Sequence, residues 1–538
     1  MSLTRVSQSM IGYNGSTTIN TNTTITEDVF IGSGQVFNIA AGVTLTFSGQ
    51  FYAGVYQVFS GDGTVVFTEG SAVEYYPEWW LPDGGDFGIA VSKCLAATKN
   101  AGAKIVFTKS HDCLTPINAT GNHKGWVLEG RGGSGAGPSW GVTIAFAHTG
   151  VGLDCSDSEY IFINNLKFKG GPLAQNPVTT IPSVGILFAR NVAGSGCGKH
   201  SLTNVIFDYV SRFTIAGIYN YGGEEFVFLN CHLINIQANT QVVVITCANP
   251  FGVKSPFINL STATNLSTSV FKFISGAYYA GGGATSSTFY IDGAANFSVD
   301  GPLVMNVDGY ALFYFNCANA QSANMSFRDI REEIGATGAD YAFKFGGGTQ
   351  FPYNFIIEGN RFGSNITSLY VDDNIKLSSL FFRSNVGASI SVQNLDYSTI
   401  DMGSTSFTGR SGGTGVIQST ITGFLSQISL LGPKNNTTIN DILYNSLQKY
   451  GSGGANNYSV GTLTLTPNSA TTVVTNVPFI AANSTVLLTP TSSTAAADVG
   501  SATSVYVSAI SAATSFTITH PNNANVDKTF NYMIFTGS

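Results

Sequence analysis

A dense cluster of charged residues lies in the segment FRDIREEIGATGADYAF, residues 327–343. Arg328, Asp329, Arg331, Glu332 and Glu333 fall within six positions, although only 10% of the chain is charged. Two carboxyl groups can cleave a glycosidic bond, with retention when about 5 to 5.5 Å apart and with inversion when about 6.5 to 9.5 Å apart. The cluster is therefore a candidate for acid–base chemistry, and an ordinary solvated edge of the fold is the alternative.

Strand alternation divides this cluster. If the two flanking isoleucines point inward, Glu332 points inward too, while Asp329, Arg331 and Glu333 face outward on one side. Glu333 is then the leading catalytic candidate. Glu332 stays a candidate because a corner or bulge would turn it outward. The alternative for Arg331 and Glu333 is a surface or intersubunit ion pair.

The register of this segment against its neighbours has two solutions. Asp308, Glu333, Glu358 and Arg383 recur at a spacing of 25 residues, and rungs of that length would stack them. Stacked carboxylates repel one another, which raises one pKa as a general acid requires. Aligning NMSFRDI (324–330) with NFIIEGN (354–360) instead sets Arg328 level with Glu358, and the stack of carboxylates disappears.

Further polar and aromatic residues complete the candidate set. Asp300 in FSVDGP and the aspartates of YVDDN (370–374) are typical of turns, and Glu225 follows a Gly-Gly corner where a solvated turn is the alternative. Tyrosine rings stack on sugars and arginines bind acidic sugars, although many tyrosines of such a chain belong to its core. The candidate catalytic residues are Glu333, Glu332, Glu358, Asp308, Asp329 and Asp300. The candidate substrate-binding residues are Arg331, Arg328, Arg361, Tyr310, Tyr314, Tyr341, Tyr221 and Glu225, with Tyr219, Tyr278 and Tyr279 as further tyrosines.

The composition excludes several classes of protein. The net charge is −7 without basic runs, which argues against nucleic acid as a partner, whereas a sugar polymer suits such a weakly charged surface. The sequence has no long apolar run for a membrane span and no apolar core of a secretory signal near its start. Seven scattered cysteines predict buried free thiols, and six histidines without HExxH spacing predict no metal site and no cofactor.

The pattern along the chain predicts an all-β protein with one helix ahead of its main repeats. Short alternating runs broken by glycine fill residues 29–68, and helical spacing over about 86–101 ends at Gly102. Strand-like segments then recur at about 25 to 30 residues, with asparagine at their ends, which is typical of a β-solenoid with asparagine ladders. The helix is expected to cap the open end of this coil.

Four regions follow from these patterns. We predict an N-terminal β region over 1–76, a β-helix carrying the active site over 77–410, a linker with a short helix near 438–449 over 411–457, and a small β-sandwich over 458–538. The sandwich prediction depends on alternating strands at about ten-residue spacing in the last region.

The segment EYYPEWWLPDGGDFGIAVSKCLAATKNAGAKIVF (74–107) resembles the opening of pectate-lyase-like β-helices. LPDGGDFGIAV replaces the acidic run of that family and KSHDC replaces its PxGxY turn, so the detailed contacts of the cap differ. TRVSQSM (4–10) resembles the join after the virion-anchoring domain of phage tailspikes, and STVLLTPTSS with its following strands resembles their small carbohydrate-binding-like end domain. The matching positions of the opening are Pro77, Glu78, Trp79, Trp80, Asp83, Gly84 and Gly102.

The chain thus resembles a bacteriophage tailspike depolymerase. This resemblance implies a homotrimer of right-handed parallel β-helices that binds and cleaves bacterial capsular polysaccharide or exopolysaccharide, most readily by hydrolysis. It also implies synthesis in the host cytoplasm, a place in the virion tail and an anchoring region outside this chain. The alternatives are a polysaccharide lyase and a non-catalytic receptor-binding spike.

Overall fold

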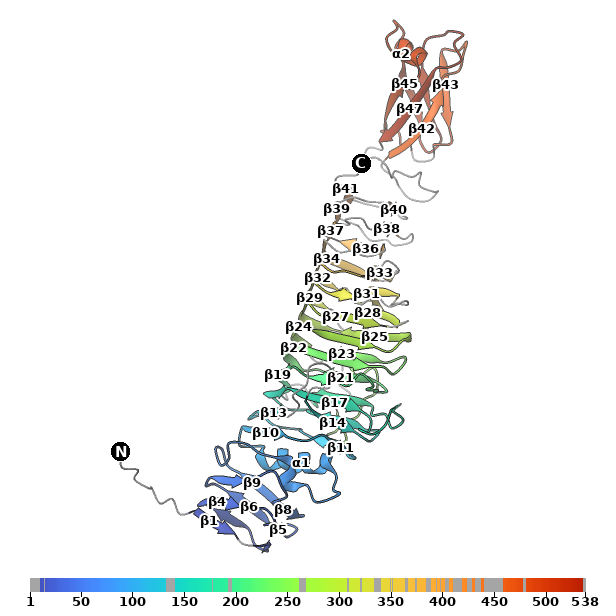
Figure 1. The fold of residues 1–538 in the computed structure, drawn as a ribbon. Coiled ribbons are helices and arrows are strands. Elements are labelled where there is room, and N and C mark those ends of the chain that lie inside the picture. The colour runs from blue at the N-terminus through green and yellow to red at the C-terminus, as the bar shows by residue number, and fades with distance from the viewer. Residues whose placement is uncertain are drawn as a thin grey trace, which may run out of the picture.

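The computed structural model describes most of the chain. The described residues are 10–13, 15–131, 141–176, 178–191, 196–260, 268–306, 309–319, 322–332, 340–348, 350, 352–362, 366–372, 375–383, short strands between 389 and 439, 458–477 and 480–535. They form an N-terminal stack of strands, a long coil and a C-terminal domain (Figure 1). None of the described helices is long and apolar enough to cross a membrane.

The N-terminal stack is itself a short coil of parallel strands. Alternate apolar residues of its strands point into one core shared by three small sheets; examples are Val29, Phe37, Phe47 and Phe67. Each sheet takes every third strand. The strands are β1 (Met10–Tyr13), β2 (Thr17–Ile19), β3 (Thr23–Ile25), β4 (Asp28–Ile31), β5 (Phe37–Ile39), β6 (Thr44–Phe47), β7 (Phe51–Ala53), β8 (Phe59–Gly61) and β9 (Thr64–Phe67).

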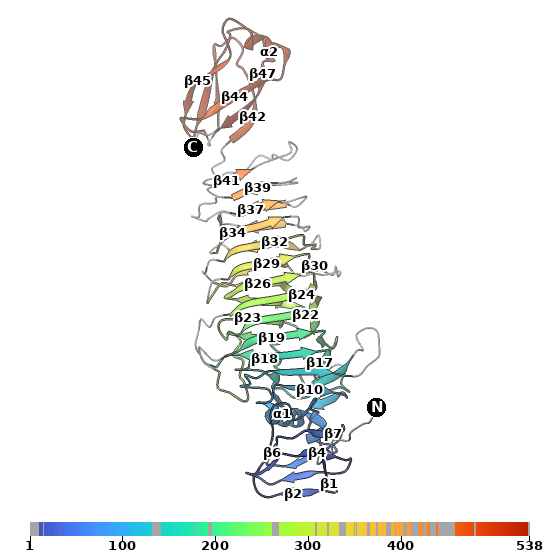
Figure 2. The ribbon, with the colours of Figure 1, turned by 90° about the vertical axis from the view of Figure 1, so that its left-hand side faces the viewer.

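Two helical elements join this stack to the main coil. The 3-10 helix η1 (Pro77–Trp80) buries Trp79, whose Nε1 donates to the carbonyl of Gly54 at 2.8 Å. The helix α1 (Phe87–Thr98) begins at Asp86, whose carboxylate accepts from the Gly88 amide at 2.9 Å. The helix lies where it was predicted. It does not close a free end of the coil, because the N-terminal stack continues on its other side (Figure 2).

The main coil is built from two long parallel sheets, which confirms the predicted parallel β-helix. Among the described strands the first sheet has 20 and the second has 12. In the first sheet they are β10 (Ala103–Phe107), β11 (His111–Cys113), β13 (Trp126–Gly130), β14 (Val142–Phe146), β16 (Ile161–Asn164), β17 (Leu166–Gly170), β19 (Gly198–Thr203), β20 (Ile206–Phe207), β22 (Glu224–Asn235), β24 (Thr268–Ala280), β26 (Ala294–Asp300), β27 (Leu303–Asn306), β29 (Ala323–Arg328), β30 (Arg331–Glu332), β32 (Tyr353–Glu358), β34 (Lys376–Arg383), β36 (Asn394–Asp396), β37 (Ser398–Asp401), β39 (Ser419–Thr422) and β41 (Thr437–Ile439).

The second sheet forms another side of the coil, opposite the first in the view of Figure 1. Its last described strand, like the last two of the first sheet, lies beyond residue 410, so the coil continues past the predicted boundary. The predicted helix near 438–449 begins inside a strand, and its remainder lies outside the described residues. The strands are β12 (Ile117–Asn118), β15 (Val151–Asp154), β18 (Val184–Ala189), β21 (Ala216–Tyr221), β23 (Gln241–Thr246), β25 (Gly283–Asp292), β28 (Gly309–Asn316), β31 (Tyr341–Gly346), β33 (Thr367–Val371), β35 (Ser389–Val392), β38 (Ser406–Gly409) and β40 (Ile428–Leu430).

A column of left-handed residues bends the first sheet into two faces. The predicted asparagine ladder is part of it: Asn204 donates to Asn165 at 3.0 Å, and Asn230 donates to Asn204 at 2.8 Å. Asn and Asp adopt this conformation more readily than other residues with a Cβ atom. Asp329 occupies the same column, with φ of 51°. Asp329 is therefore the corner between β29 and β30.

The C-terminal domain has the predicted β-sandwich form. Two antiparallel sheets, ordered β42–β47–β44 and β43–β46–β45, enclose a core around Phe516, Ile518 and Phe530. A short helix covers one end. The elements are β42 (Tyr458–Thr464), β43 (Thr471–Thr475), β44 (Thr485–Pro490), α2 (Ser493–Val499), β45 (Tyr506–Ser511), β46 (Ser515–Thr519) and β47 (Thr529–Phe535).

Candidate functional site

Charged residues of alternating sign form a column at the end of four neighbouring strands of the first sheet. Asp300 is paired with Arg328, Arg328 with Glu358, and Glu358 with Arg383. The rungs are thus 28 and 30 residues long before the last step of 25, and the second of the two predicted registers is confirmed. The uniform 25-residue stack is wrong, because an arginine lies level with Glu358.

The alternation of charge stabilises this column. The Arg328 Nε atom lies 3.6 Å from Glu358 Oε2, and both side chains are accessible to solvent. Opposite charges on adjacent strands attract, whereas a column of carboxylates would repel itself. Asp300 and Glu358 are two rungs apart, which places their Cα atoms roughly 9.6 Å apart, near the upper end of the carboxyl separation of an inverting glycosidase.

The rest of the charged cluster is divided by the corner. Asp329 is exposed at the corner itself, Ile330 is buried, and Arg331 is exposed on β30. Strand alternation therefore does not run through the segment, which corrects the prediction that Asp329 shares a strand face with Arg331. Glu332 is half-buried, level with the buried Val304, which agrees with its predicted inward position.

Two further predicted residues lie beside or outside this cluster. The backbone of Arg361 accepts from the Glu332 amide at 2.9 Å, and Arg361 forms a parallel bridge with Arg331. These residues surround the corner after the charged column. Asp308 and Glu333, the two carboxylates predicted to stack with Glu358, lie outside the described residues.

A second column of functional side chains lies on the outer face of the second sheet. Tyr290, Tyr314, Lys344 and Tyr370 occupy the same position on the four successive strands β25, β28, β31 and β33. The residues on either side of each point into the core, since Phe289, Phe313, Phe343 and Leu369 are fully buried. Strand alternation therefore directs the whole column outward.

Additional tyrosines extend this column into a continuous run of aromatic rings, which we call the tyrosine stack. It comprises the five residues Tyr290, Tyr310, Tyr314, Tyr341 and Tyr370. Tyr290 is buried at one end of it, and the other rings are partly exposed. Successive ring centroids lie 5.5 Å (290 to 314), 5.5 Å (310 to 314), 5.6 Å (310 to 341) and 4.7 Å (341 to 370) apart. Such distances are typical of edge-to-face and offset aromatic packing.

One ion pair is embedded in the tyrosine stack. The Lys344 ammonium pairs with the Asp372 carboxylate and lies 3.8 Å from the ring centroid of Tyr370 and 5.4 Å from that of Tyr341. Lys344 is almost completely buried, whereas Asp372 is partly exposed. The ammonium holds the two rings in place through cation–π contacts, and the carboxylate presents an acceptor to solvent.

The tyrosine hydroxyl groups act as hydrogen-bond donors at neutral pH. Burial is the largest cause that raises the pKa of Tyr310, to about 12, and the Asp372 carboxylate adds to this effect. Burial also raises the pKa of Tyr290 and of Tyr314. These phenols therefore stay protonated and suit the recognition of hydroxyl groups rather than proton abstraction.

A segment after β23 covers the lower part of the same face. Phe251 in this segment lies 6.2 Å from the ring of Tyr219 and 5.0 Å from that of Tyr290. Tyr219 and Tyr221 are buried beneath it, and Tyr278 is buried in the main core. Of the predicted tyrosines, Tyr310, Tyr314 and Tyr341 are brought together at the surface, whereas Tyr221 has no access to a sugar.

Glu225 lies apart from both columns. It is exposed in the left-handed conformation, in a second column of such residues between Lys199 and Val270. Its neighbour Glu224 pairs with Arg190 at 3.7 Å. Glu225 is therefore an exposed residue within β22, and it does not lie in the solvated turn that the sequence allowed as the alternative.

No group of three or more metal-ligating side chains occurs within the described residues. The seven cysteines are all buried free thiols, as predicted. Burial raises the pKa of each of them, that of Cys231 to about 12, so the thiols are protonated at neutral pH.

Sequence reasoning missed Tyr290, Lys344 and Tyr370, and it assigned Asp372 to a turn. A signal for them exists in four short segments, TFYID (288–292), LFYFN (312–316), AFKFG (342–346) and SLYVD (368–372). In each, an outward Tyr or Lys stands between two core residues. The four segments line up only if the rungs of the coil differ in length. The prediction used a uniform spacing of 25 residues and therefore did not align them.

The chain was compared with known proteins. No family model and no curated protein matches it. Among solved structures it is similar to the tailspike of Acinetobacter phage vB_ApiP_P1 (11% identity, 86% of this chain and 87% of that chain, TM-score 0.37). It is also similar to the tailspike gp49 of Acinetobacter baumannii phage Fri1, a capsular polysaccharide depolymerase (10%, 86% and 86%, 0.38), and to the tailspike gp49 of Pseudomonas phage LKA1 (10%, 96% and 88%, 0.34).

These structures are phage tailspikes, the class that the sequence motifs resemble. At such identities and TM-scores the similarity carries no argument about activity. The fold of this chain is established by its own strand pairing, and a fold alone does not determine the chemistry of a protein.

Proposed function

We propose that the chain is a phage tailspike that binds and cleaves a bacterial surface polysaccharide. The observation that carries the proposal is the tyrosine stack with Lys344 at its centre. From Tyr314 to Tyr370 the partly exposed part of the column spans two rung spacings, roughly 10 Å along the coil. A surface of this length suits a stretch of linear polymer rather than a single sugar.

The side chains of the stack match the chemistry of a polysaccharide. Tyrosine rings offer apolar faces to sugar rings, and their protonated hydroxyls offer donors to ring oxygens and hydroxyl groups. Asp372 offers an acceptor at the edge of the stack. Because Lys344 is neutralised by Asp372, the surface suits a neutral or weakly charged polymer of the capsular or exopolysaccharide class.

Cleavage is proposed at the charged column of the first sheet. Asp300 and Glu358 would act as the acid and the base of an inverting hydrolysis, one protonating the leaving oxygen and the other activating water. Arg328 lies between them and would bind the sugar at the scissile bond. In this arrangement the tyrosine stack tethers the polymer while another stretch of it is cut.

A polysaccharide lyase is the second candidate. The two candidates differ in their products, because elimination leaves an unsaturated sugar that absorbs ultraviolet light and hydrolysis does not.

The assembly proposed for this function is a homotrimer at the virion tail, acting at the surface of the host cell. Two exposed apolar residues, Leu229 and Ile274, are paired on neighbouring strands of the first sheet. They support a contact between copies of this chain. Light scattering of the purified chain tests the trimer, for which a monomer at micromolar concentration would be the contrary result.

Incubation with purified host capsule, followed by mass spectrometry of the products, tests the proposed function. We expect saturated oligosaccharide fragments from the wild-type chain and none from Glu358→Gln. Intact polymer after incubation with the wild-type chain would reject cleavage, and absence of binding would reject the whole proposal.

A further inference from the structure

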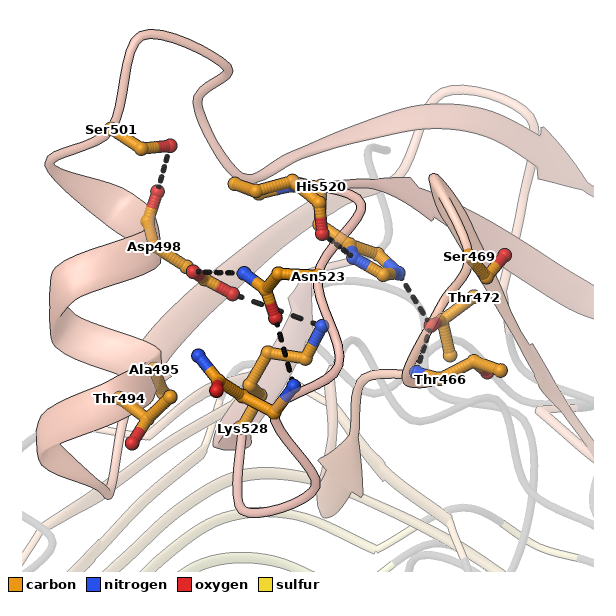
Figure 3. Close-up of polar contacts among 12 residues, drawn as sticks. Thr466, Ser469, Thr472, Thr494, Ala495, Asp498, Ser501, His520, Asn523 and Lys528 are labelled. Carbon is orange, nitrogen blue, oxygen red and sulfur yellow. Dashed lines mark hydrogen bonds and ion pairs between the residues drawn. The ribbon is translucent and has the colours of Figure 1, made fainter.

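A buried polar cluster lies in the C-terminal domain, within a part of the chain that the proposed function does not use. Lys528 immediately precedes β47, Asp498 lies on α2, and Asn523 lies in the connection between β46 and β47. Lys528 is 0% exposed and Asp498 is 5% exposed. Figure 3 shows the amine of Lys528 and the carboxamide of Asn523 beside the same carboxylate.

Two atoms of this cluster have no hydrogen-bond partner. They are Nζ of Lys528 and Oδ2 of Asp498, both buried and 4.0 Å apart. A buried charge without hydrogen bonds is expensive, and so is a buried ion pair whose remaining donors and acceptors are unsatisfied. Transfer of one proton from the ammonium to the carboxylate removes both charges and leaves a neutral amine and a carboxylic acid.

The same carboxyl group also holds a carboxamide. Nδ2 of Asn523 donates to Oδ1 of Asp498 at 2.9 Å, and the Asn525 amide donates to Oδ1 of Asn523 at 3.2 Å. One oxygen of the carboxyl group thus lies 4.0 Å from a nucleophile, and the other accepts a hydrogen bond from a leaving group. The backbone donor on the carboxamide oxygen polarises the carbonyl in the direction that an attack requires.

We propose that Lys528 and Asn523 form an intramolecular isopeptide bond, promoted by Asp498. The lone pair of the neutral Lys528 Nζ attacks Cγ of Asn523, and the carbonyl electrons move onto Oδ1. Asp498 donates its proton to Nδ2 and takes a proton from the attached Nζ. The carbonyl reforms as the Cγ–Nδ2 bond breaks, ammonia leaves, and Asp498 ends as the acid it was at the start.

The folded domain provides what the reaction needs. The reacting groups are held by α2 and by the connection between β46 and β47, so the step is intramolecular, and the amine and the carboxyl group are buried. No oxidant or cofactor is required, because an amine and a carboxamide give a secondary amide and ammonia.

Mass spectrometry of the whole purified chain, before and after denaturation and trypsin digestion, tests the bond. Trypsin cuts after lysine only when its amine is free, and the sequence has no Lys or Arg between residues 450 and 527. We expect an intact mass lower by one ammonia and a single peptide covering 450–538. The variants Asn523→Ala and Asp498→Ala should each lack that mass loss and should release the peptide 529–538.

Asn525→Ala is the matched control, because the Asn525 carboxamide is not one of the three reacting groups. This variant should show the same loss of one ammonia as the wild-type chain. An intact mass without any loss, together with release of 529–538 from the wild-type chain, would overturn the proposal. Loss of one water instead of ammonia would also overturn it, since the amide would then be on Asp498.

Discussion

Replacing Tyr314 by alanine should weaken polysaccharide binding about tenfold without unfolding the coil. Tyr314 lies in the middle of the tyrosine stack, with its ring centroid 5.5 Å from those of Tyr290 and Tyr310. Its side chain points outward, while the neighbouring Phe313 and Phe315 remain in the core. The substitution therefore removes a surface ring and leaves the packing beneath it intact.

The magnitude follows from the contacts that are lost. An aromatic contact at such a distance contributes about 0.5 to 1.5 kcal/mol beyond its buried area, and about 1.4 kcal/mol corresponds to a tenfold change in Kd. A sugar ring stacked on Tyr314 loses one contact of this kind. This contact alone corresponds to roughly a two- to tenfold change in Kd, and loosening of the adjacent rings lowers the affinity further, so we expect a change of about tenfold.

Calorimetric titration with oligosaccharide fragments of the host polymer measures this change. The titration uses a Glu358→Gln background so that the ligand is not consumed. Tyr209→Ala is the matched control, because Tyr209 is 59% exposed and follows β20, away from the stack. Equal affinities of the Tyr314→Ala and Tyr209→Ala chains would refute the role of the stack.

Three further predictions concern catalysis, acid stability and the corner ladders. Asp300→Asn and Glu358→Gln should each lower the rate of polymer cleavage by roughly 10²-fold or more with binding retained, whereas Glu225→Gln should cleave at the wild-type rate in a reducing-end assay. Burial lowers the pKa of His200 to about 3, so the unfolded chain takes up a proton below about pH 6.5 that the folded chain does not. The contribution of His200 to the free energy of unfolding is complete above that pH and falls by about 1.4 kcal/mol per pH unit between 6.5 and 3. The variant His200→Gln should therefore unfold in acid with a midpoint at lower pH. Asn324→Ala should lower the free energy of unfolding by about 2 kcal/mol, because it removes the hydrogen bonds to Asn296 and Asn354 and strains a residue with φ of 54°. Asn324→Gly loses the same hydrogen bonds without the backbone strain, so thermal denaturation should show a smaller loss for it.

Much of the fold could be predicted from local sequence patterns. Alternation of apolar residues predicted the strands, helical spacing ending at Gly102 predicted α1, and asparagine at strand ends predicted the ladders of Asn204 and Asn230. These features depend on residues close together in the chain. The end of the coil was set too early, because the strands after 410 follow glycine-rich segments that also suit a linker.

The candidate site was harder to predict because it depends on register. A rung of 30 residues in place of 25 exchanges Glu333 for Arg328 as the neighbour of Glu358, and nothing local in the sequence fixes that length. Burial of Tyr221 could not be predicted either. Its strand position is outward, and the segment that covers it begins after the following strand.

Glu332 illustrates the same difficulty at a corner. Its half-buried position follows from alternation within β30, but alternation could not be carried from β29 through Asp329, whose left-handed conformation restarts the pattern. Sequence periodicity is reliable within a strand and fails where a single residue changes the direction of the chain.

The position of a bound oligosaccharide tests the central claim most directly. A crystal structure of the chain carrying Asp300→Asn and Glu358→Gln, soaked with a fragment of the host polysaccharide, should show sugar rings along the second sheet against Tyr310, Tyr314 and Tyr370. Sugar bound only elsewhere on the coil, with the tyrosine stack unoccupied at saturating ligand, would contradict the account.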